Sequence, residues 1–213
     1  MSTTIEQFAK SSAQNGCSTA GLRELDNQIL EVLLSIVNTE EQTNLVSCSD
    51  IPRLKVVGNS TMPVLQPAAR DSLQRVIEQE DRQLNLIHAY RTVAQQFVLR
   101  QWKMNGKCGI TAARKPGTSD HERGTAIDIE HFDVWRDALE SNGWEWAGPG
   151  DRGHFKFAGP GVNNDVLTES VRAFQVLWNR NHPEDPIDED GIFGDVETGP
   201  RLLRTPIEGF EIV

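Results

Sequence analysis

The stretch between Ser119 and Asp128 holds the residue types that a metal-dependent reaction needs. It reads S-D-H-E-R-G-T-A-I-D, so His121 offers an imidazole nitrogen and Asp128, seven positions later, offers a carboxylate oxygen. Both groups are common zinc ligands. Gly124 allows the backbone to turn between them, and a strand holding Ala126 and Asp128 would point both side chains to one face. We therefore predict that His121 and Asp128 bind one metal ion.

A second short segment, D-R-G-H-F, can complete such a site. A catalytic zinc usually has three protein ligands and one open position for water, and His154 is the third candidate ligand. Asp151 lies three residues before it and can act as a general base on the metal-bound water, whose pKa falls to about 7. These residues predict attack of zinc-bound hydroxide on an amide carbonyl, with Asp151 returning the proton to the leaving amine.

Together the motifs S-x-H-x-x-G-x-A-x-D and D-x-x-H-F resemble those of the M15 family of zinc peptidases. That family comprises D-Ala-D-Ala carboxypeptidases and dipeptidases, together with related phage endolysins. The resemblance covers residues 50–158 and implies that His121, Asp128 and His154 bind zinc and that Asp151 is the base. Many members have Glu at the place of Asp151, while others have Asp.

The resemblance also implies residues that handle the substrate. Tyr90-Arg91-Thr92 matches a Y-R-T or Y-R-S segment of the family, in which the arginine holds the polarised carbonyl oxygen or a substrate carboxylate. The fixed fork of donors in a guanidinium suits that role. Ser119 matches a serine near the substrate, and Tyr90 joins Arg91 as a candidate. Trp144 is a candidate wall of the site, although a tryptophan in such a position is more often part of a core.

Other titratable residues near these motifs receive ordinary structural interpretations. His88 and His131 are predicted to be structural, because a lone histidine on a strand is more often hydrogen-bonded than a metal ligand. Glu122 and Glu130 are predicted to be solvated.

The remaining pattern predicts an α+β fold, with helices packed on a small, mostly antiparallel sheet that carries the metal site. Apolar residues at helical spacing predict helices over residues 22–37, 63–80, 92–104, 132–142, 167–180 and 198–203. Short runs predict strands at residues 54–57, 84–90, 125–129, 144–146 and 154–157. With a boundary at G-P-G, we expect a flexible arm over residues 1–20, an M15-like peptidase domain over 21–160 and a C-terminal module over 161–213.

The C-terminal segment carries V-x-x-F-Q from Val171 to Gln175, then D-G-x-x-G from Asp190 and a threonine that opens a helix. This set resembles the small three-helix peptidoglycan-binding module and implies binding to the cell wall. The acidic insert over residues 182–190 is longer than the usual linker. A calcium loop over Asp188, Asp190 and Glu197 is disfavoured, because its first position would be a proline without a side-chain oxygen.

Composition limits the partners. The formal net charge of -10 argues against nucleic acid, and the longest apolar stretch is too short and too polar to span a membrane. Three distant cysteines favour free thiols and a reducing compartment. No signal peptide is recognised, so we expect non-standard export, delivery by lysis or a cytoplasmic substrate.

Taken together, the sequence predicts a monomeric zinc peptidase that acts on peptidoglycan or its stem peptides. Its most favoured activity is D-alanyl-D-alanine carboxypeptidase. The alternatives are an endolysin-type endopeptidase, a cytoplasmic D,D-dipeptidase and a non-catalytic wall-binding protein with a structural metal site.

Overall fold

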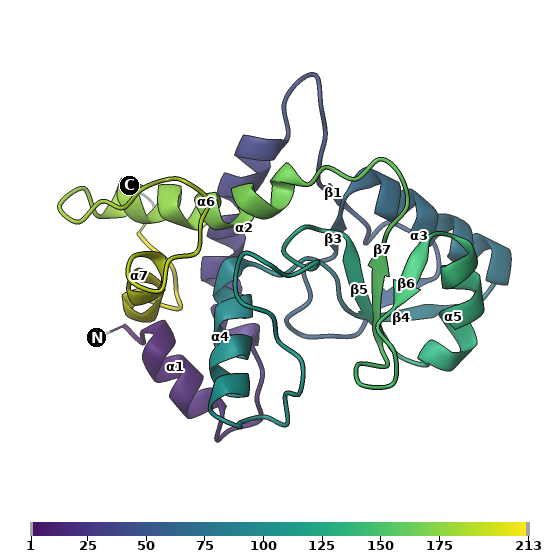
Figure 1. Cartoon of the computed structure of the whole chain (residues 1–213), viewed down its shortest axis with the longest axis horizontal. Helices are drawn as coiled ribbons and strands as arrows, with labels where there is room; N and C mark the ends of the chain where they lie inside the picture. Colours follow the sequence, from purple (N-terminus) through teal and green to yellow (C-terminus); the bar gives the residue numbers. More distant parts are fainter. Residues whose placement is uncertain (1, 212–213) are drawn as a thin grey trace. The chain divides into compact units, whose positions relative to one another are not determined.

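The computed structural model describes residues 2–211, and its helices and strands agree closely with the predicted ones (Figure 1). The helices are α1 (Ile5–Ser12), the 3-10 helix η1 (Ala20–Leu22), α2 (Arg23–Val37), α3 (Pro67–Glu80), α4 (Val93–Met104), α5 (Phe132–Ser141), α6 (Asp165–Asn181) and α7 (Thr198–Arg204). The strands are β1 (Val46–Ser47), β2 (Leu54–Val56), β3 (Val64–Leu65), β4 (Leu84–His88), β5 (Ala126–Ile129), β6 (Trp144–Trp146) and β7 (His154–Phe157). The predicted α+β class is confirmed.

Five strands form one mixed sheet in the order β2-β4-β5-β7-β6. β2 and β4 are parallel, whereas the other neighbouring pairs are antiparallel. The prediction of a small, mostly antiparallel sheet is therefore confirmed. β1 and β3 pair in a separate two-stranded sheet that the sequence did not predict, because two-residue strands are too short to show alternation.

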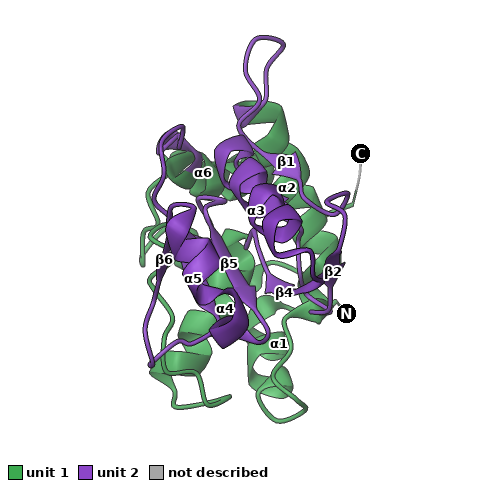
Figure 2. Cartoon of the chain, turned by 90° about the vertical axis from the view of Figure 1, so that its right-hand side faces the viewer, with its two compact units in different colours: residues 1–36, 92–119, 167–213 green, residues 37–91, 120–166 purple. Residues whose placement is uncertain are grey.

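The described chain divides into two compact units, each assembled from segments that are distant in sequence (Figure 2). Unit 1 consists of residues 1–36, 92–119 and 167–213, and unit 2 consists of residues 37–91 and 120–166. The predicted organisation instead treats residues 21–160 as one peptidase domain. Compactness does not assign function, so the peptidase domain and the wall-binding module stay predictions.

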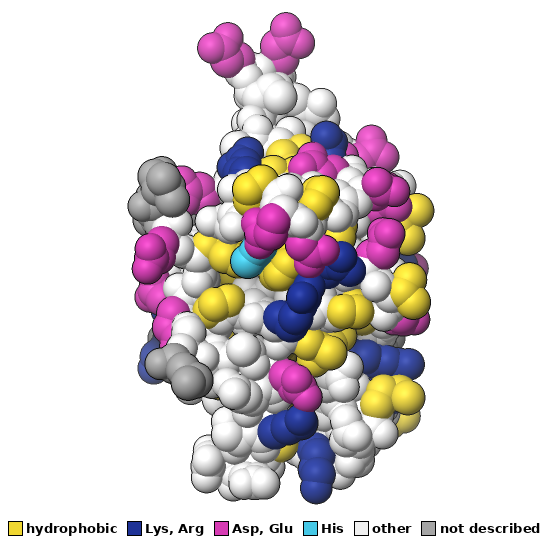
Figure 3. Space-filling model, turned by 90° about the vertical axis from the view of Figure 1, so that its left-hand side faces the viewer, with side chains coloured by type: hydrophobic (Ala, Val, Ile, Leu, Met, Phe, Trp, Pro, Cys, Tyr) yellow, Lys and Arg dark blue, Asp and Glu magenta, His cyan; other side chains and the backbone are white. Residues whose placement is uncertain are grey.

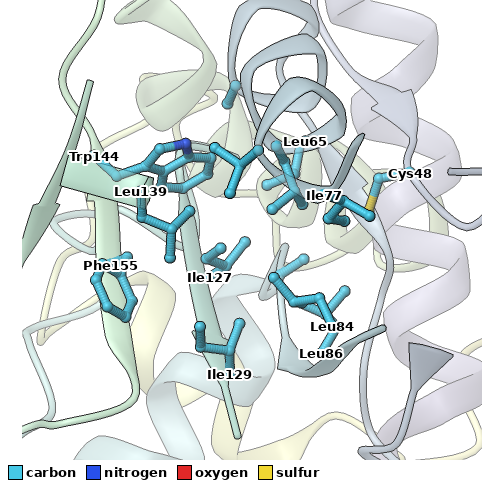
Figure 4. Packing of buried hydrophobic residues seen from close by; sticks show 14 of the residues in the cluster. Cys48, Leu65, Ile77, Leu84, Leu86, Ile127, Ile129, Leu139, Trp144 and Phe155 are labelled. Atoms are coloured by element: carbon cyan, nitrogen blue, oxygen red, sulfur yellow. The ribbon is translucent and has the colours of Figure 1, made fainter. Parts of the chain in front are cut away.

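Unit 2 has its core between one face of the five-stranded sheet and the helices α3 and α5 (Figure 4). Ile127 and Ile129 of β5 lie in this core, so strand alternation directs Ala126 and Asp128 to the opposite face. Neighbouring buried side chains of the core are Leu73, Val76, Ile77, Leu84, Leu86, Leu139, Trp144, Phe155 and Phe157. One face of the sheet is thus apolar, and the other is available for polar groups.

Helix α1 of unit 1 lies where the sequence predicts a flexible arm. Its N-terminus carries a capping box, in which the Gln7 N–H donates to the Thr4 hydroxyl and the Thr4 N–H donates to the Gln7 side chain. Ile5 and Ala9 are buried, and the indole of Trp102 donates to the Ala9 carbonyl at 2.7 Å. The prediction of a flexible arm is therefore wrong for residues 5–12, which form a helix. The sequence did not reveal this helix because eight residues with two buried positions show little periodicity.

The cysteines also differ from expectation. Cys17 and Cys108 form a disulfide within unit 1 across a sequence separation of 91 residues, so the prediction of free thiols is wrong for this pair. Cys48 is free and buried, as predicted. An odd number of cysteines permits one bridge plus one thiol, and sequence spacing alone does not bring distant positions together.

The C-terminal segment contains two helices, α6 and α7, within its described residues rather than the three expected. Its motif residues meet around the buried side chain of Gln175. The amide of Gln175 donates to Asp190 Oδ1 at 2.9 Å, and its carbonyl accepts the Gly191 N–H at 2.8 Å. A longer contact of 3.4 Å joins Gln175 to the Thr198 hydroxyl. The motif therefore holds the segment's own fold together.

One face of the molecule is drawn with its side chains coloured by type in Figure 3. On the face drawn in Figure 3, acidic, basic and hydrophobic side chains are interspersed. Within residues 2–211, no helix has both the length and the apolar character needed to cross a membrane.

Candidate metal centre

Three side chains form a row across the face of the unit 2 sheet that lies opposite the apolar core. Asp128 of β5 is the direct cross-strand partner of His88 on β4 and of His154 on β7. Directly opposed residues of antiparallel strands place their side chains side by side. The register therefore brings a carboxylate between two imidazoles, although the three residues are far apart in sequence.

His121 enters the row from the loop that precedes β5. Gly124 supplies the turn, with a φ of +74° and with its N–H donating to the His121 carbonyl at 3.1 Å. A Cβ at Gly124 would lie 2.6 Å from a methyl carbon of Leu45, so both the backbone angle and the space favour glycine. The sequence predicts glycine at this position because the backbone must turn between the two candidate ligands. The structure adds a second reason, which is the close approach of Leu45.

The ligand atoms of His121, Asp128 and His154 all lie within 4.8 Å of one another. His121 Nε2 is 3.1 Å from His154 Nδ1 and 3.3 Å from Asp128 Oδ1, and His154 Nδ1 is 2.9 Å from Asp128 Oδ1. Zinc–ligand bonds of about 2.0–2.1 Å in a tetrahedron require ligand atoms about 3.3 Å apart. The three atoms fit one face of such a tetrahedron after small outward shifts. This is the one group of its kind in residues 2–211.

The ring of His121 is prepared for metal binding. Its Nδ1 lies 2.6 Å from the Ala89 carbonyl, which fixes the proton on Nδ1 and leaves the Nε2 lone pair toward the cluster. Burial, aided by the positive charge of Arg91, lowers the pKa of His121 to about 4. The imidazole is therefore neutral at pH 7, the form that binds a metal.

The two oxygens of Asp128 face different partners. Oδ1 lies near His121 and His154, whereas Oδ2 accepts hydrogen bonds from His88 Nδ1 at 3.1 Å and from Arg91 Nη2 at 3.2 Å. Burial by itself would raise the pKa of Asp128, but the neighbouring histidines hold it well below its usual value. The carboxylate is thus ionised, and its Oδ2 is held by His88 and Arg91.

Arg91 lies beside the cluster with a side chain that is 12% exposed. Burial lowers the pKa of its guanidinium, and the negative charges of Asp128, Glu122 and Asp151 oppose that shift. The expectation that Glu122 is solvated is wrong, because its residue is fully buried. Glu130 is exposed, as predicted, and accepts a hydrogen bond from Asn85.

Asp151 lies in the turn between β6 and β7. The turn is closed by hydrogen bonds from the Asp151 N–H to the Gly148 carbonyl and from the His154 N–H to the Asp151 carbonyl. Partial desolvation and the nearby charge of Asp128 raise the pKa of Asp151. A raised pKa makes a carboxylate a better proton acceptor, which suits a general base.

The three residues predicted to contact the substrate, Tyr90, Ser119 and Trp144, are all buried. Tyr90 and Ser119 are buried, with 1% and 4% of their surface exposed, and Ser119 belongs to unit 1. Trp144 is also buried, and its indole donates to Ser72 Oγ at 3.1 Å. Because Trp144 lies in the core of unit 2, it is not the wall of the metal centre.

The sequence predicts that His88 is a hydrogen-bonded structural residue, and its Nδ1 does lie 3.1 Å from Asp128 Oδ2, but its place beside the candidate ligands was not predicted. The alternation L-N-L-I-H predicts that His88 shares a face with the core residues Leu84 and Leu86. The signal that could have found it is indirect, namely its place two residues before the Y-R-T segment. His131 is exposed, lies at the N-cap of α5 and is not part of the cluster.

The histidine–aspartate–histidine cluster of His121, Asp128 and His154 could therefore hold a metal ion. Residues 64–147 match the family model VanY, described as D-alanyl-D-alanine carboxypeptidase. This match confirms the predicted resemblance for that stretch, which is similar to peptidases that act on peptidoglycan. It includes Arg91, His121 and Asp128, whereas Asp151 and His154 lie beyond it. No curated protein was found to match the chain.

Proposed function

We propose that this protein is a zinc-dependent D-alanyl-D-alanine carboxypeptidase that shortens the stem peptides of peptidoglycan. The observation that carries the proposal is the convergence of three ligand atoms within 4.8 Å on the polar face of the sheet. The family match at residues 64–147 supports the substrate class.

In this proposal His121, Asp128 and His154 hold the zinc ion. When bound, zinc would supply a Lewis acid for the scissile carbonyl and would lower the pKa of a bound water molecule. Asp151 would accept a proton from the water that attacks the carbonyl carbon and would return it to the leaving amine of D-alanine. Its raised pKa supports this role.

Arg91 has two parts in the proposal. It donates to Asp128 Oδ2 and so orients a ligand, and it contributes positive charge where the carbonyl oxygen or the terminal carboxylate of the substrate becomes negative. A guanidinium can do both because its donors point in several fixed directions.

The test is digestion of purified muropeptides by the zinc-loaded protein, analysed by mass spectrometry. Loss of one terminal alanine supports the proposal, whereas split stems identify an endopeptidase. Asp151→Asn should lower kcat by about 100- to 10,000-fold and leave bound zinc unchanged. Asp137→Asn, a change at an exposed position of α5, serves as the matched control. Full activity of Asp151→Asn would contradict the assigned base.

The absence of hydrolysis by the unmodified, zinc-containing protein would favour the alternative of a wall-binding protein with a structural metal site. A metal content of zero in the unmodified protein would contradict both proposals. The two measurements therefore separate the catalytic and structural roles of the centre.

We also propose that the C-terminal segment binds the cell wall. Its support is the Gln175 network, which joins the motif residues Asp190, Gly191 and Thr198 into one structure. A cavity of about 900 Å³ in unit 1 offers a binding surface with aromatic and charged sides; its lining includes Trp178, His182, Asp185, Arg204 and Phe210. Sedimentation with insoluble peptidoglycan tests this role, and Phe210→Ala should reduce the bound fraction while leaving muropeptide hydrolysis in solution unchanged.

We further propose that the protein acts at the cell wall. The Cys17–Cys108 disulfide supports action outside a reducing compartment, because such bonds persist mainly in oxidising surroundings. Thiol labelling of the protein before and after its release from cells tests this proposal.

A further inference from the structure

His88 reaches the metal centre through an irregularity in the sheet. Leu86 pairs with Ile129, a core residue, while His88 pairs with Asp128 on the polar face, and the register shifts between the two pairs. Without that bulge, regular alternation would place His88 on the apolar face with Leu86. A bulge redirects the following side chain, and bulges are over-represented next to active sites.

The redirected ring contacts one particular oxygen. His88 Nδ1 lies 3.1 Å from Asp128 Oδ2, the oxygen that also accepts from Arg91 Nη2 at 3.2 Å. The other oxygen, Oδ1, is 2.9 Å from His154 Nδ1 and 3.3 Å from His121 Nε2. His88 and Arg91 therefore hold Oδ2, and Oδ1 is left toward the ligand atoms of the two histidines.

We infer that His88 is a positioning residue that makes Asp128 bind the metal through Oδ1 alone. The inference rests on the proposed function and deepens it. Two donors on Oδ2 prevent the carboxylate from rotating to bind with both oxygens. A single-oxygen ligand leaves more room around the ion, which the open water position of a catalytic centre requires.

A direct ligand role for His88 is the competing explanation. The three ligand atoms that share one small volume come from His121, Asp128 and His154, and His88 is not among them. Its ring instead contacts the carboxylate oxygen on the far side of that cluster. Four protein ligands would also close a tetrahedral site, as in structural zinc centres.

Two substitutions separate positioning from packing. His88→Phe keeps a planar ring on the strand but removes the donor, whereas His88→Asn places an amide N–H near the position of Nδ1. His131→Asn is the matched control, because His131 is an exposed histidine of the same unit in a left-handed conformation that asparagine tolerates.

The first measurement is metal affinity, with zinc and with cobalt(II) as a spectroscopic probe. His88→Phe should weaken binding about 10- to 100-fold, the usual effect of losing a group that orients a ligand. Its cobalt form should absorb more weakly in the visible range, because a carboxylate that binds with both oxygens raises the coordination number. His88→Asn should restore affinity and spectrum, and His131→Asn should match the unmodified protein.

The second measurement counts imidazoles on zinc by X-ray absorption, and two are expected. Three imidazoles would overturn the inference by making His88 a ligand. An unchanged spectrum and affinity in His88→Phe would overturn it as well. These readouts do not need turnover, so a protein that binds zinc tightly but hydrolyses nothing would contradict the proposed function and still decide the role of His88.

Discussion

Each of the two units contains an aspartate that is largely withdrawn from water, and the pKa values of the two carboxyl groups are shifted in opposite directions. Asp26 of unit 1 accepts hydrogen bonds of 2.6 Å from the Thr92 hydroxyl and from the Gln95 amide, and burial raises its pKa to about 7. Burial also acts to raise the pKa of Asp128 in unit 2, but the contacts with His121, His154 and His88 hold that pKa well below the usual value. Neutral donors do not offset the loss of water around a carboxylate, whereas a cluster that includes titratable rings does.

The two units also differ in which parts of the chain their polar groups and cysteines connect. In unit 1 they connect distant segments: Asp26 joins α2 to the start of α4, and the Cys17–Cys108 bond joins two loops. In unit 2 the row His88, Asp128 and His154 gathers donors and acceptors at one point of a sheet. The buried polar groups of unit 1 therefore connect segments that are distant in sequence, whereas those of unit 2 converge on the candidate metal centre.

The largest expected effect concerns the disulfide. Replacing both Cys17 and Cys108 by alanine should lower the free energy of unfolding of unit 1 by about 4–5 kcal/mol, from the chain entropy of closing a loop of this length. Hydrogen exchange should show reduced protection of the α1 and α4 amides. The five-stranded sheet of unit 2 should keep its protection.

A reducing agent should reproduce this loss in the unmodified protein and have no effect on the double variant. Equal loss of protection in α4 and in β5 would contradict this prediction, because it would mean that the disulfide stabilises both units to the same extent.

Zinc should have the complementary effect. At a free concentration of about 1,000 times its Kd, zinc should stabilise the state that binds it by about 4 kcal/mol. The gain should appear in the amides of β5 and β7, because the candidate ligands lie on or before these strands, and in those of β4, which carries His88 beside Asp128. Exchange measured with zinc and with a chelator checks the prediction, and protection confined to α1 and α4 would contradict it.

Much of unit 2 follows from its sequence because its signals are local. The strands at residues 144–146 and 154–157 are found with their observed limits, and the three candidate ligands lie in two short motifs. The bulge before His88, in contrast, has no local signal in the sequence. Nothing in L-N-L-I-H marks an interrupted register, because the interruption depends on the strand with which it pairs.

Unit 1 is harder to predict because its contacts join segments that are distant in sequence. The helix periods of α2, α4 and α6 are clear, but no local pattern indicates that Cys17 meets Cys108 or that Asp26 meets Thr92. The same limit explains Trp144, whose core position depends on Ser72 from a distant helix. Local pattern predicts elements well and their partners poorly.

The buried Asp26 gives a prediction that depends on pH. Its pKa is about 7 in the folded protein against 3.8 in the unfolded chain, so the folded state binds the proton more tightly. The contribution of Asp26 to the free energy of unfolding should be greatest below about pH 4 and fall as the pH rises toward about 7, by at most about 4 kcal/mol. Asp26→Asn resembles the protonated form and should remove this fall. Denaturant titrations at several pH values check it, and a variant with the same pH dependence as the unmodified protein would contradict the contrast with Asp128.

The smallest expected effect concerns two glycines of unit 2 that share a left-handed backbone. Gly124 has a φ of +74°, and a Cβ added there would lie 2.6 Å from Leu45, whereas Gly148 has a φ of +90° and open space around it. Gly148→Ala should cost about 1 kcal/mol for backbone conformation alone, and Gly124→Ala should cost about 2 kcal/mol because Leu45 must also move.

Only Gly124→Ala should weaken zinc binding, because the Gly124 N–H donates to the carbonyl of His121. Denaturant titration and zinc affinity of both variants measure the two effects separately. Equal losses of stability with unchanged zinc affinity would mean that the close packing at Gly124 does not position His121, and that the loop and the sheet row contribute to the site independently.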